Sequence, residues 1–459
     1  MFSTLLLLGL IGQVPAGMST AAAGTLEGRP PVADASPLQR RVDAAPAGST
    51  IEVAAGRYVG DLIIDRPLRL VAAGDARLIG SGHGSVLRIR ADDVTVEGFD
   101  IDGVGGGDLA RDASGIHVAG RRATIRRCHI VRSLFGVYLR EADGTVVDHV
   151  VVDGMPGRDP GEQGSGIHLW NTTGFQLLGN TVRNSRDGIY IQSSTGGAAL
   201  GNLVTDVRYG LHYMFSDGNR FEDNTFERSA AGAALMYSAH LVFRRNRFLH
   251  NRGFASVGLL MQGCDDVIAE DNLIADNARG VFMENTRGDV FRHNVIADAD
   301  TAVVLYASAD RCRFEGNAFV GNLSPLVLVG RRTDTVFDGN YWSDHDAPDL
   351  DGDGVADRPY RLSNVFDHLR GNLTAADLFA QGLGAAVLAS AERTLPVLEP
   401  MPVVDAHPLA RAPYLSNVPA PIVEASQGTV WGAGLSSLGL IVGLSVLWSG
   451  RRRRQARTS

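Results

Sequence analysis

The sequence predicts an all-β fold, a right-handed parallel β-helix, because short segments repeat at a nearly fixed period. A glycine followed by alternating apolar residues recurs at spacings of 22, 22, 22, 26 and 22 residues, at Gly166, Gly188, Gly210, Gly232, Gly258 and Gly280. An asparagine recurs about once per period, at Asn180, Asn202, Asn224, Asn246, Asn272, Asn294, Asn317 and Asn340. The segments between these landmarks are too short for helices. Each period is therefore one coil, and the asparagines are expected to stack and share hydrogen bonds along the axis.

The first part of the chain contains two predicted elements. Residues 1–23 are predicted to be a signal peptide, because an apolar run from Leu5 to Ile11 precedes small residues at Ala21–Ala23. This signal places the mature protein in the periplasm. The stretch Leu38–Ala44 has the apolar spacing of a short helix. This helix is expected to cap the open core of the β-helix, which is assigned to residues 36–345.

The last part of the chain is predicted to leave the solenoid and reach the membrane. Residues 346–425 are assigned to an acidic loop, an amphipathic helix and an extended segment. The helix is predicted over Thr374–Leu395 from the spacing of Leu378, Phe379, Leu383, Val387 and Leu388. Residues 429–449 lack charge and are long enough for a transmembrane helix that anchors the protein to the inner membrane. The arginine-rich residues 450–459 are the expected cytoplasmic tail.

Composition excludes several function classes. The formal net charge is −8, so no basic surface for nucleic acid is expected. All 43 basic residues are arginine, which excludes any mechanism that needs a lysine. The three cysteines, Cys128, Cys264 and Cys312, have no CxxC spacing and are expected to be buried or loop thiols.

Outward-facing positions of the coils supply the candidate site. Side chains alternate along a strand, so the second and fourth residues after each repeated glycine should face outward. His212 and Met214 then lie on one strand, and Met236 stacks on Met214 from the next coil. Imidazole and thioether ligands select cuprous copper over hard cations, so these three residues are candidate copper ligands. The alternative is a partner-binding surface, to which the outward His168, Trp170 and Tyr190 would also belong.

The acidic stretch near residue 350 has part of a calcium-loop pattern. Asp349, Asp351, Asp353 and Asp357 occupy positions 1, 3, 5 and 9 of that pattern, whereas position 12 is Tyr360 instead of the bidentate glutamate. A complete EF-hand is therefore excluded. A calcium clip on the last coils and a turn held by Asx hydrogen bonds are both open at this point.

A secreted polysaccharide-binding or polysaccharide-cleaving β-helix is the alternative function. Cleavage would need either two carboxylates about 5 to 9 Å apart or a basic residue with calcium. The outward rows offer Glu284, and Glu141 lies several coils away. The sequence therefore disfavours cleavage more than binding.

Several motifs together resemble the NosD family. They are the asparagine column, GLHYMFSDGN from Gly210, GAALMYS from Gly232, the stretch NYWSDHDAPDLDGDGVADRPY at 340–360 and DAHPLARAP at 405–413, and the similarity runs from about Leu38 to Pro413. The resemblance implies a non-enzymatic periplasmic β-helix that works with an ABC transporter of the NosF and NosY type. It further implies action with a copper lipoprotein of the NosL type in assembling the copper-sulfide centre of nitrous oxide reductase. Five residues map onto the family's signature as candidate site residues: His212, Tyr213, Met214, Met236 and Tyr237. Of these, Tyr213 and Tyr237 are expected to bind a partner.

Overall fold

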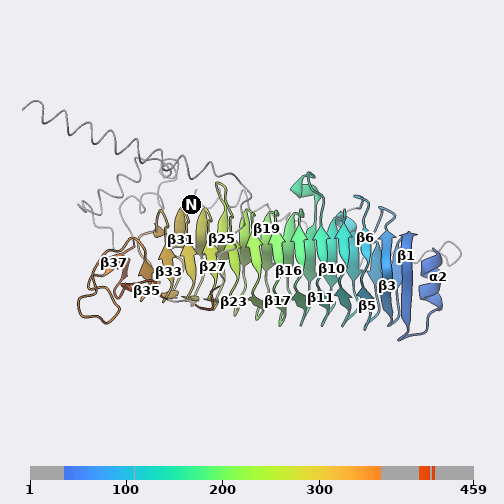
Figure 1. Ribbon diagram of the computed structural model, residues 1–459, viewed down its shortest axis with the longest axis horizontal. Helices are drawn as coiled ribbons and strands as arrows, with labels where there is room; N and C mark the ends of the chain where they lie inside the picture. Colours follow the sequence, from blue (N-terminus) through green and yellow to red (C-terminus); the bar gives the residue numbers. More distant parts are fainter. Residues whose placement is uncertain (1–35, 108, 363–402, 414–415, 419–459) are drawn as a thin grey trace, which may run out of the picture. The chain divides into compact units, whose positions relative to one another are not determined.

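The protein winds into coils of three strands, as seen in a computed structural model that describes residues 36–107, 109–362, 403–413 and 416–418. Figure 1 shows the strands of successive coils side by side, from β1 at the blue end to β35 and β37 at the orange end. The strands of successive coils pair in parallel. The predicted right-handed parallel β-helix is therefore confirmed as the fold, and the twelve strands of one sheet give one strand per coil.

The three strands of each coil form three faces of the solenoid. The twelve-stranded sheet has six-residue strands in most of its coils. Its strands are β2 (Leu62–Ile64), β4 (Leu87–Ile89), β7 (Ser114–Val118), β10 (Phe135–Arg140), β13 (Ser165–Trp170), β16 (Asp187–Gln192), β19 (Tyr209–Met214), β22 (Ala231–Met236), β25 (Val257–Gln262), β28 (Arg279–Glu284), β31 (Thr301–Tyr306) and β34 (Leu326–Val329). We call this sheet the long-strand sheet.

The other two faces consist of short strands that belong to one 26-stranded sheet. One face contains β5 (Thr95–Glu97), β8 (Thr124–Arg126), β11 (Val146–Asp148), β14 (Gln176–Leu178), β17 (Ala198–Leu200), β20 (Arg220–Glu222), β23 (Val242–Arg244), β26 (Ile268–Glu270), β29 (Val290–Arg292), β32 (Arg313–Glu315) and β35 (Val336–Asp338). The other contains β6 (Asp100–Asp102), β9 (His129–Val131), β12 (Val151–Asp153), β15 (Thr181–Arg183), β18 (Leu203–Thr205), β21 (Thr225–Glu227), β24 (Arg247–Leu249), β27 (Leu273–Ala275), β30 (Val295–Ala297), β33 (Ala318–Val320) and β36 (Tyr341–Trp342). Two longer strands, β1 (Thr50–Val59) and β3 (Arg69–Ile79), begin both faces.

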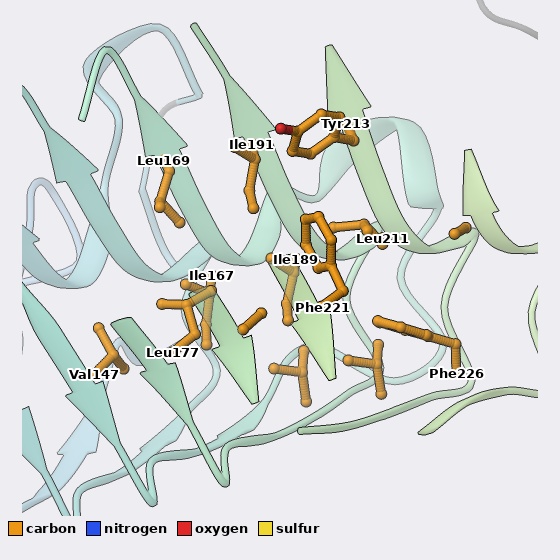
Figure 2. Packing of buried hydrophobic residues seen from close by; sticks show 14 of the residues in the cluster. Val147, Ile167, Leu169, Leu177, Ile189, Ile191, Leu211, Tyr213, Phe221 and Phe226 are labelled. Carbon is orange, nitrogen blue, oxygen red and sulfur yellow. The ribbon is translucent and has the colours of Figure 1, made fainter. Parts of the chain in front are cut away.

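The interior of the coils is filled by the hydrophobic core. Each strand contributes one or two inward side chains to it. In the long-strand sheet the inward residues alternate with outward ones, as in Ile167 and Leu169 or Ile189 and Ile191, and all four are fully buried. Figure 2 shows these side chains pointing toward the same interior from neighbouring coils. Burial of each such side chain stabilises the fold by about 1.5–3 kcal/mol. The three cysteines are buried free thiols, as expected.

A helix closes the first coil. Helix α2 (Pro37–Ala44) begins after Ser36, whose hydroxyl accepts a hydrogen bond from the backbone N–H of Gln39. Its apolar residues Leu38 and Val42 are buried against the core. The Gln39 amide exchanges two hydrogen bonds with the backbone of Ile63 in β2 and thereby pairs an edge strand. The predicted capping helix is confirmed.

The asparagine column lies at the corner between the two short-strand faces. Asn202, for example, donates from Nδ2 to Oδ1 of Asn224 and to the carbonyl oxygen of Leu177. The ladder ends at Asp405 in β38 (Val404–Asp405), whose buried carboxylate accepts from Nδ2 of Asn340 and Nε1 of Trp342. This acid belongs to the DAHPL motif and caps the column, a role that sequence analysis missed.

Several predicted elements lie outside the described residues. They are the signal peptide at 1–23, the amphipathic helix at Thr374–Leu395, the transmembrane helix at 429–449 and the tail at 450–459. In the part of the chain that the structure describes, no helix is both long and apolar enough to span a membrane. The remaining short elements are the 3₁₀ helices η2 (Leu109–Arg111) and η3 (Pro160–Glu162) and the strand β37 (Tyr360–Arg361).

Candidate copper-binding face

The outer surface of the long-strand sheet carries the candidate site. The strand register aligns one outward residue per coil, in the order His117, Tyr138, His168, Tyr190, His212, Ala234, Leu260, Phe282, Val304 and Val327. We call this line of residues the outer row. The members from His168 to Phe282 each lie two residues after a repeated glycine, at the outward position predicted from the sequence. Its first half is made of aromatic and imidazole rings, and its second half is apolar.

His212 is oriented by a buried ion cluster. Its Nδ1 lies 3.1 Å from Oδ2 of Asp187, which is fully buried on the strand before it. Asp187 also accepts two hydrogen bonds from Arg208, at 2.8 and 2.9 Å. Burial alone would raise the pKa of Asp187, but the hydrogen bonds from His212 and Arg208 hold it well below its usual value. With the carboxylate on Nδ1, Nε2 is the nitrogen of His212 that is available as a ligand.

The two methionines lie next to each other in register. Met214 in β19 pairs with Met236 in β22, and both belong to one apolar cluster on the outer surface. The hydroxyl of Tyr190 approaches the sulfur of Met214 at 3.8 Å. Met236 is buried and Met214 is half-buried, so a cation held here would lose most of its water. Soft thioether ligands in such surroundings suit cuprous copper.

Sequence analysis missed Asp187, because strand alternation does not predict its direction. Asp187 immediately precedes the repeated glycine Gly188 and sits two residues before the inward Ile189. Strict strand alternation would place Asp187 on the inward side with Ile189, so its contact with the outward His212 shows that the alternation does not hold before the glycine. Ser165 and Tyr209 occupy the equivalent position in the neighbouring coils.

The ring half of the outer row is tightly stacked. Tyr190 stacks on His168 with 4.4 Å between ring centroids, and His168 contacts Tyr138 at 4.5 Å. Burial, with a smaller effect of Arg186, lowers the pKa of His168 to about 3, so this imidazole is neutral. Trp170, in the next outward column, lies under the guanidinium of Arg140 at 5.2 Å. The half-buried His168, Trp170 and Tyr190 thus lie on the outer surface, where a partner contact was predicted.

Tyr213 does not lie on that surface. Its side chain is fully buried in the core, where the ring contacts Phe221 at 5.5 Å and the hydroxyl oxygen accepts from Nδ2 of Asn219. Figure 2 shows Tyr213 pointing inward together with Leu211. The assignment of Tyr213 as a partner-binding residue is therefore wrong, because strand alternation places it opposite His212 and Met214.

Tyr237 is exposed and pairs with another aromatic residue. Its ring stacks on Phe215 with 5.3 Å between centroids and 10° between planes, and each side chain is about half exposed. Both residues have left-handed backbone angles, in a turn column that holds Asn171, Ser193 and Gly263 in other coils. A bulky side chain is costly in that conformation. Left-handed residues recur at many turns of this solenoid, so the conformation alone does not mark a site, and a partner contact at Tyr237 stays a prediction.

The outward carboxylates of the long-strand sheet are not arranged for sugar cleavage. Asp187 in β16 and Glu284 in β28 are four strands apart, which is roughly 19 Å at the usual strand spacing. Two catalytic carboxylates of a glycosidase lie within about 10 Å of each other. Asp187 is also fully occupied by Arg208 and His212.

The acidic loop brings three of its four predicted residues together. Carboxylate oxygens of Asp349, Asp351 and Asp353 all lie within 4.8 Å of one another. Asp357 instead accepts from the backbone N–H of Leu350 at 2.6 Å. The loop's own backbone donors also reach these acids, as in Gly352 N–H to Asp349 at 2.7 Å. Asx hydrogen bonds account for the loop's shape, and calcium binding there stays a prediction.

Comparisons with known proteins agree with the motifs. The family described as "Periplasmic copper-binding protein (NosD)" matches residues 145–347. The chain is 36% identical over 382 residues to "Probable ABC transporter binding protein NosD" of Stutzerimonas stutzeri, covering 78% of this chain and 86% of that protein. It is 33% identical over 419 residues to the protein of the same name from Pseudomonas aeruginosa, covering 88% and 95%.

Similar solved structures include enzymes that act on polysaccharides. One is the family 28 exopolygalacturonase of Yersinia enterocolitica, with 12% identity, a TM-score of 0.48 and coverage of 68% of this chain and 75% of that one. Another is a PL6 alginate lyase in complex with a trisaccharide, with 14% identity, a TM-score of 0.47 and coverage of 68% and 85%. At these similarities they carry no inference about activity.

Proposed function

This chain belongs to the NosD family, and we propose from that membership that it is a periplasmic, non-enzymatic maturation protein of nitrous oxide reductase. Its role is to receive copper for the copper-sulfide centre while bound to an ABC transporter of the NosF and NosY type. A copper lipoprotein of the NosL type is the proposed donor, and the reductase is the recipient. The names of the relatives support binding to an ABC transporter. The description of the family supports copper binding and a periplasmic location.

The observation that carries the copper role is the arrangement of His212 beside Met214 and Met236. Asp187 leaves Nε2 of His212 available, and the two thioethers are in register one strand spacing apart, at about 4.8 Å. One imidazole and two thioethers form a donor set that favours Cu(I) over calcium or magnesium. The proposed anchoring of this site next to a permease rests on the predicted transmembrane helix at 429–449.

Copper binding by the full-length protein tests this role. Cu(I) affinity is measured against a competing chromophoric chelator for the wild type and for a variant with His212→Ala, Met214→Ala and Met236→Ala. We expect the variant to lose at least tenfold in affinity. The matched control replaces the same residue types elsewhere, with Met155→Ala and His240→Ala, and should bind as the wild type does. Equal Cu(I) affinity in wild type and triple variant would contradict the assignment.

The maturation role has a separate test. Nitrous oxide reductase purified from a strain that lacks this gene should be devoid of the spectrum of the copper-sulfide centre, and complementation with the wild-type gene should restore it. A normal spectrum in the deletion strain would contradict the maturation role and leave the polysaccharide-binding alternative. The triple variant in the same strain then shows whether the copper site is needed for maturation.

A further inference from the structure

The two candidate copper sulfurs lie in a column of outward side chains that has a glutamine at each end. The strand register over β16, β19, β22 and β25 gives this column the order Gln192, Met214, Met236 and Gln262. The outer row crosses the same four strands with Tyr190, His212, Ala234 and Leu260. Each glutamine is therefore next to a methionine, but only Gln192 has a tyrosine two residues before it on its own strand.

Tyr190 contacts both kinds of candidate ligand. Its ring meets the imidazole of His212 edge-on, with 4.8 Å between the ring centroids and 86° between the planes. Its hydroxyl oxygen lies 3.8 Å from the sulfur of Met214 and donates to Oε1 of Gln192 at 2.7 Å. The four side chains are all half-buried, which strengthens the polar contacts among them relative to contacts in water.

The hydroxyl of Tyr190 has one proton and two acceptors within reach. An amide oxygen is a strong acceptor, whereas a thioether sulfur is a weak one. The distance of 2.7 Å to Gln192 is that of an ordinary O–H···O hydrogen bond. The proton therefore goes to Gln192, and the sulfur of Met214 keeps the lone pairs with which a thioether binds a soft cation.

We propose that Gln192 is a positioning residue of the copper site, which takes the proton of Tyr190 and thereby keeps the sulfur of Met214 available as a ligand. This inference rests on the proposed copper role of His212, Met214 and Met236. Among the described residues in contact with the hydroxyl, the other acceptor is Met214 itself. Without the carbonyl of Gln192, copper has to compete with a hydrogen bond for the same sulfur electrons. The net effect of one hydrogen bond corresponds to about two- to tenfold in an equilibrium constant.

Cu(I) affinity in two backgrounds tests this role. It is measured on the full-length protein against a competing chromophoric chelator. Gln192→Leu removes the acceptor, keeps a side chain of similar size and should bind Cu(I) about two- to tenfold more weakly than the wild type. In a Tyr190→Phe background the same substitution should have no further effect, because no hydroxyl proton is left to redirect. A general structural role of Gln192 would instead weaken binding equally in both backgrounds.

Gln262→Leu is the matched control. Gln262 is half-buried, lies in register with Met236 and donates from Nε2 to Oε2 of Glu284 at 3.2 Å. The residue two positions before it is Leu260, which has no hydroxyl. This variant should bind Cu(I) as the wild type does, and its melting midpoint should match that of Gln192→Leu.

A measurement without copper follows the sulfur directly. The ε-methyl group of Met214 is observed by carbon-13 NMR in copper-free protein, and Met214→Ala identifies its resonance. Gln192→Leu should shift this resonance, because the sulfur gains a hydrogen bond. Adding Tyr190→Phe should remove the effect of the glutamine substitution, and Gln262→Leu should leave the resonance in place.

The outcomes separate this inference from the copper role on which it rests. A wild type that binds Cu(I) no more tightly than Gln192→Leu would overturn the role of Gln192 and leave the copper site standing. A loss of affinity of equal size in both backgrounds would overturn it as well, since the hydroxyl of Tyr190 would then have no part in the effect. A wild type that binds no Cu(I) would overturn the copper role, and this inference with it.

Discussion

Asp289 gives a prediction whose magnitude follows from the structure. Its side chain is fully buried at a turn of the solenoid, where Oδ1 accepts from the N–H of Val267 at 2.9 Å. Burial raises the pKa of Asp289 from 3.8 to about 7, since its neighbours Thr286 and Cys312 carry no positive charge. In the same turn column Asn219 accepts from the N–H of Gly197. The turn therefore tolerates an amide.

The change Asp289→Asn should remove a pH dependence of stability. Between pH 4 and 7 the folded protein binds a proton at Asp289 that the unfolded chain releases, so the stability of the wild type falls as pH rises and levels off above pH 7. A pKa that moves from 3.8 to about 7 corresponds to at most about 4 kcal/mol. The variant carries no charge at this position at any pH, so its stability advantage grows between pH 4 and 7 and is complete above pH 7.

Hydrogen exchange measures this locally, because long repeat proteins do not always unfold in one step. Protection of β29 and β32 is compared at pH 5 and pH 8, after correction for intrinsic exchange. We expect wild-type protection to fall by up to about 10²-fold and that of the variant to stay level. Asp298→Asn, an exposed carboxylate in a neighbouring coil, is the control and should behave as the wild type. Equal pH dependence in wild type and Asp289→Asn would refute the reasoning.

Three further outcomes follow from other parts of the structure. Asp405→Ala leaves the buried donors of Asn340 and Trp342 unpaired, so unfolding of the last coils should become easier by about 3 kcal/mol or more, measured by limited proteolysis. Removing calcium with a chelator should lower the melting midpoint of the protein, because an ion held by Asp351 and the adjacent acids of its loop stabilises the folded state. Phe215→Ser with Tyr237→Ser should keep the melting midpoint and weaken binding to the transporter or reductase tenfold or more, measured by titration.

Each of these has a clear opposing result. Unchanged proteolysis after Asp405→Ala would mean that the asparagine ladder does not need its cap. A midpoint that is the same with and without chelator counts against calcium. Full partner affinity in the Phe215 and Tyr237 variant would place the docking surface elsewhere on the solenoid.

The sequence by itself determined the coil period, the cap and the direction of most side chains. The repeated glycines and asparagines are one coil apart in the sequence. Each therefore lies next to the equivalent residue of the following coil, and the sequence repeat forms a column of like residues in the structure. Alternation within each strand placed His212 and Met214 outside and Tyr213 inside, yet Tyr213 was still assigned to partner binding. That error came from adopting the family's signature as a block of residues.

Only the tertiary structure decided which residues from distant parts of the chain meet. Asp405 caps Asn340 from 65 residues away, and Asp187 reaches His212 from the preceding coil through a column that has no repeating residue type. The burial of outward apolar residues such as Leu260, Phe282 and Val304 could not be predicted from the sequence either. Strand alternation gives the direction of a side chain but not what covers it. Contacts between equivalent residues of successive coils can be predicted from the repeat spacing of the sequence. Contacts between segments that do not repeat depend on where the folded chain places them.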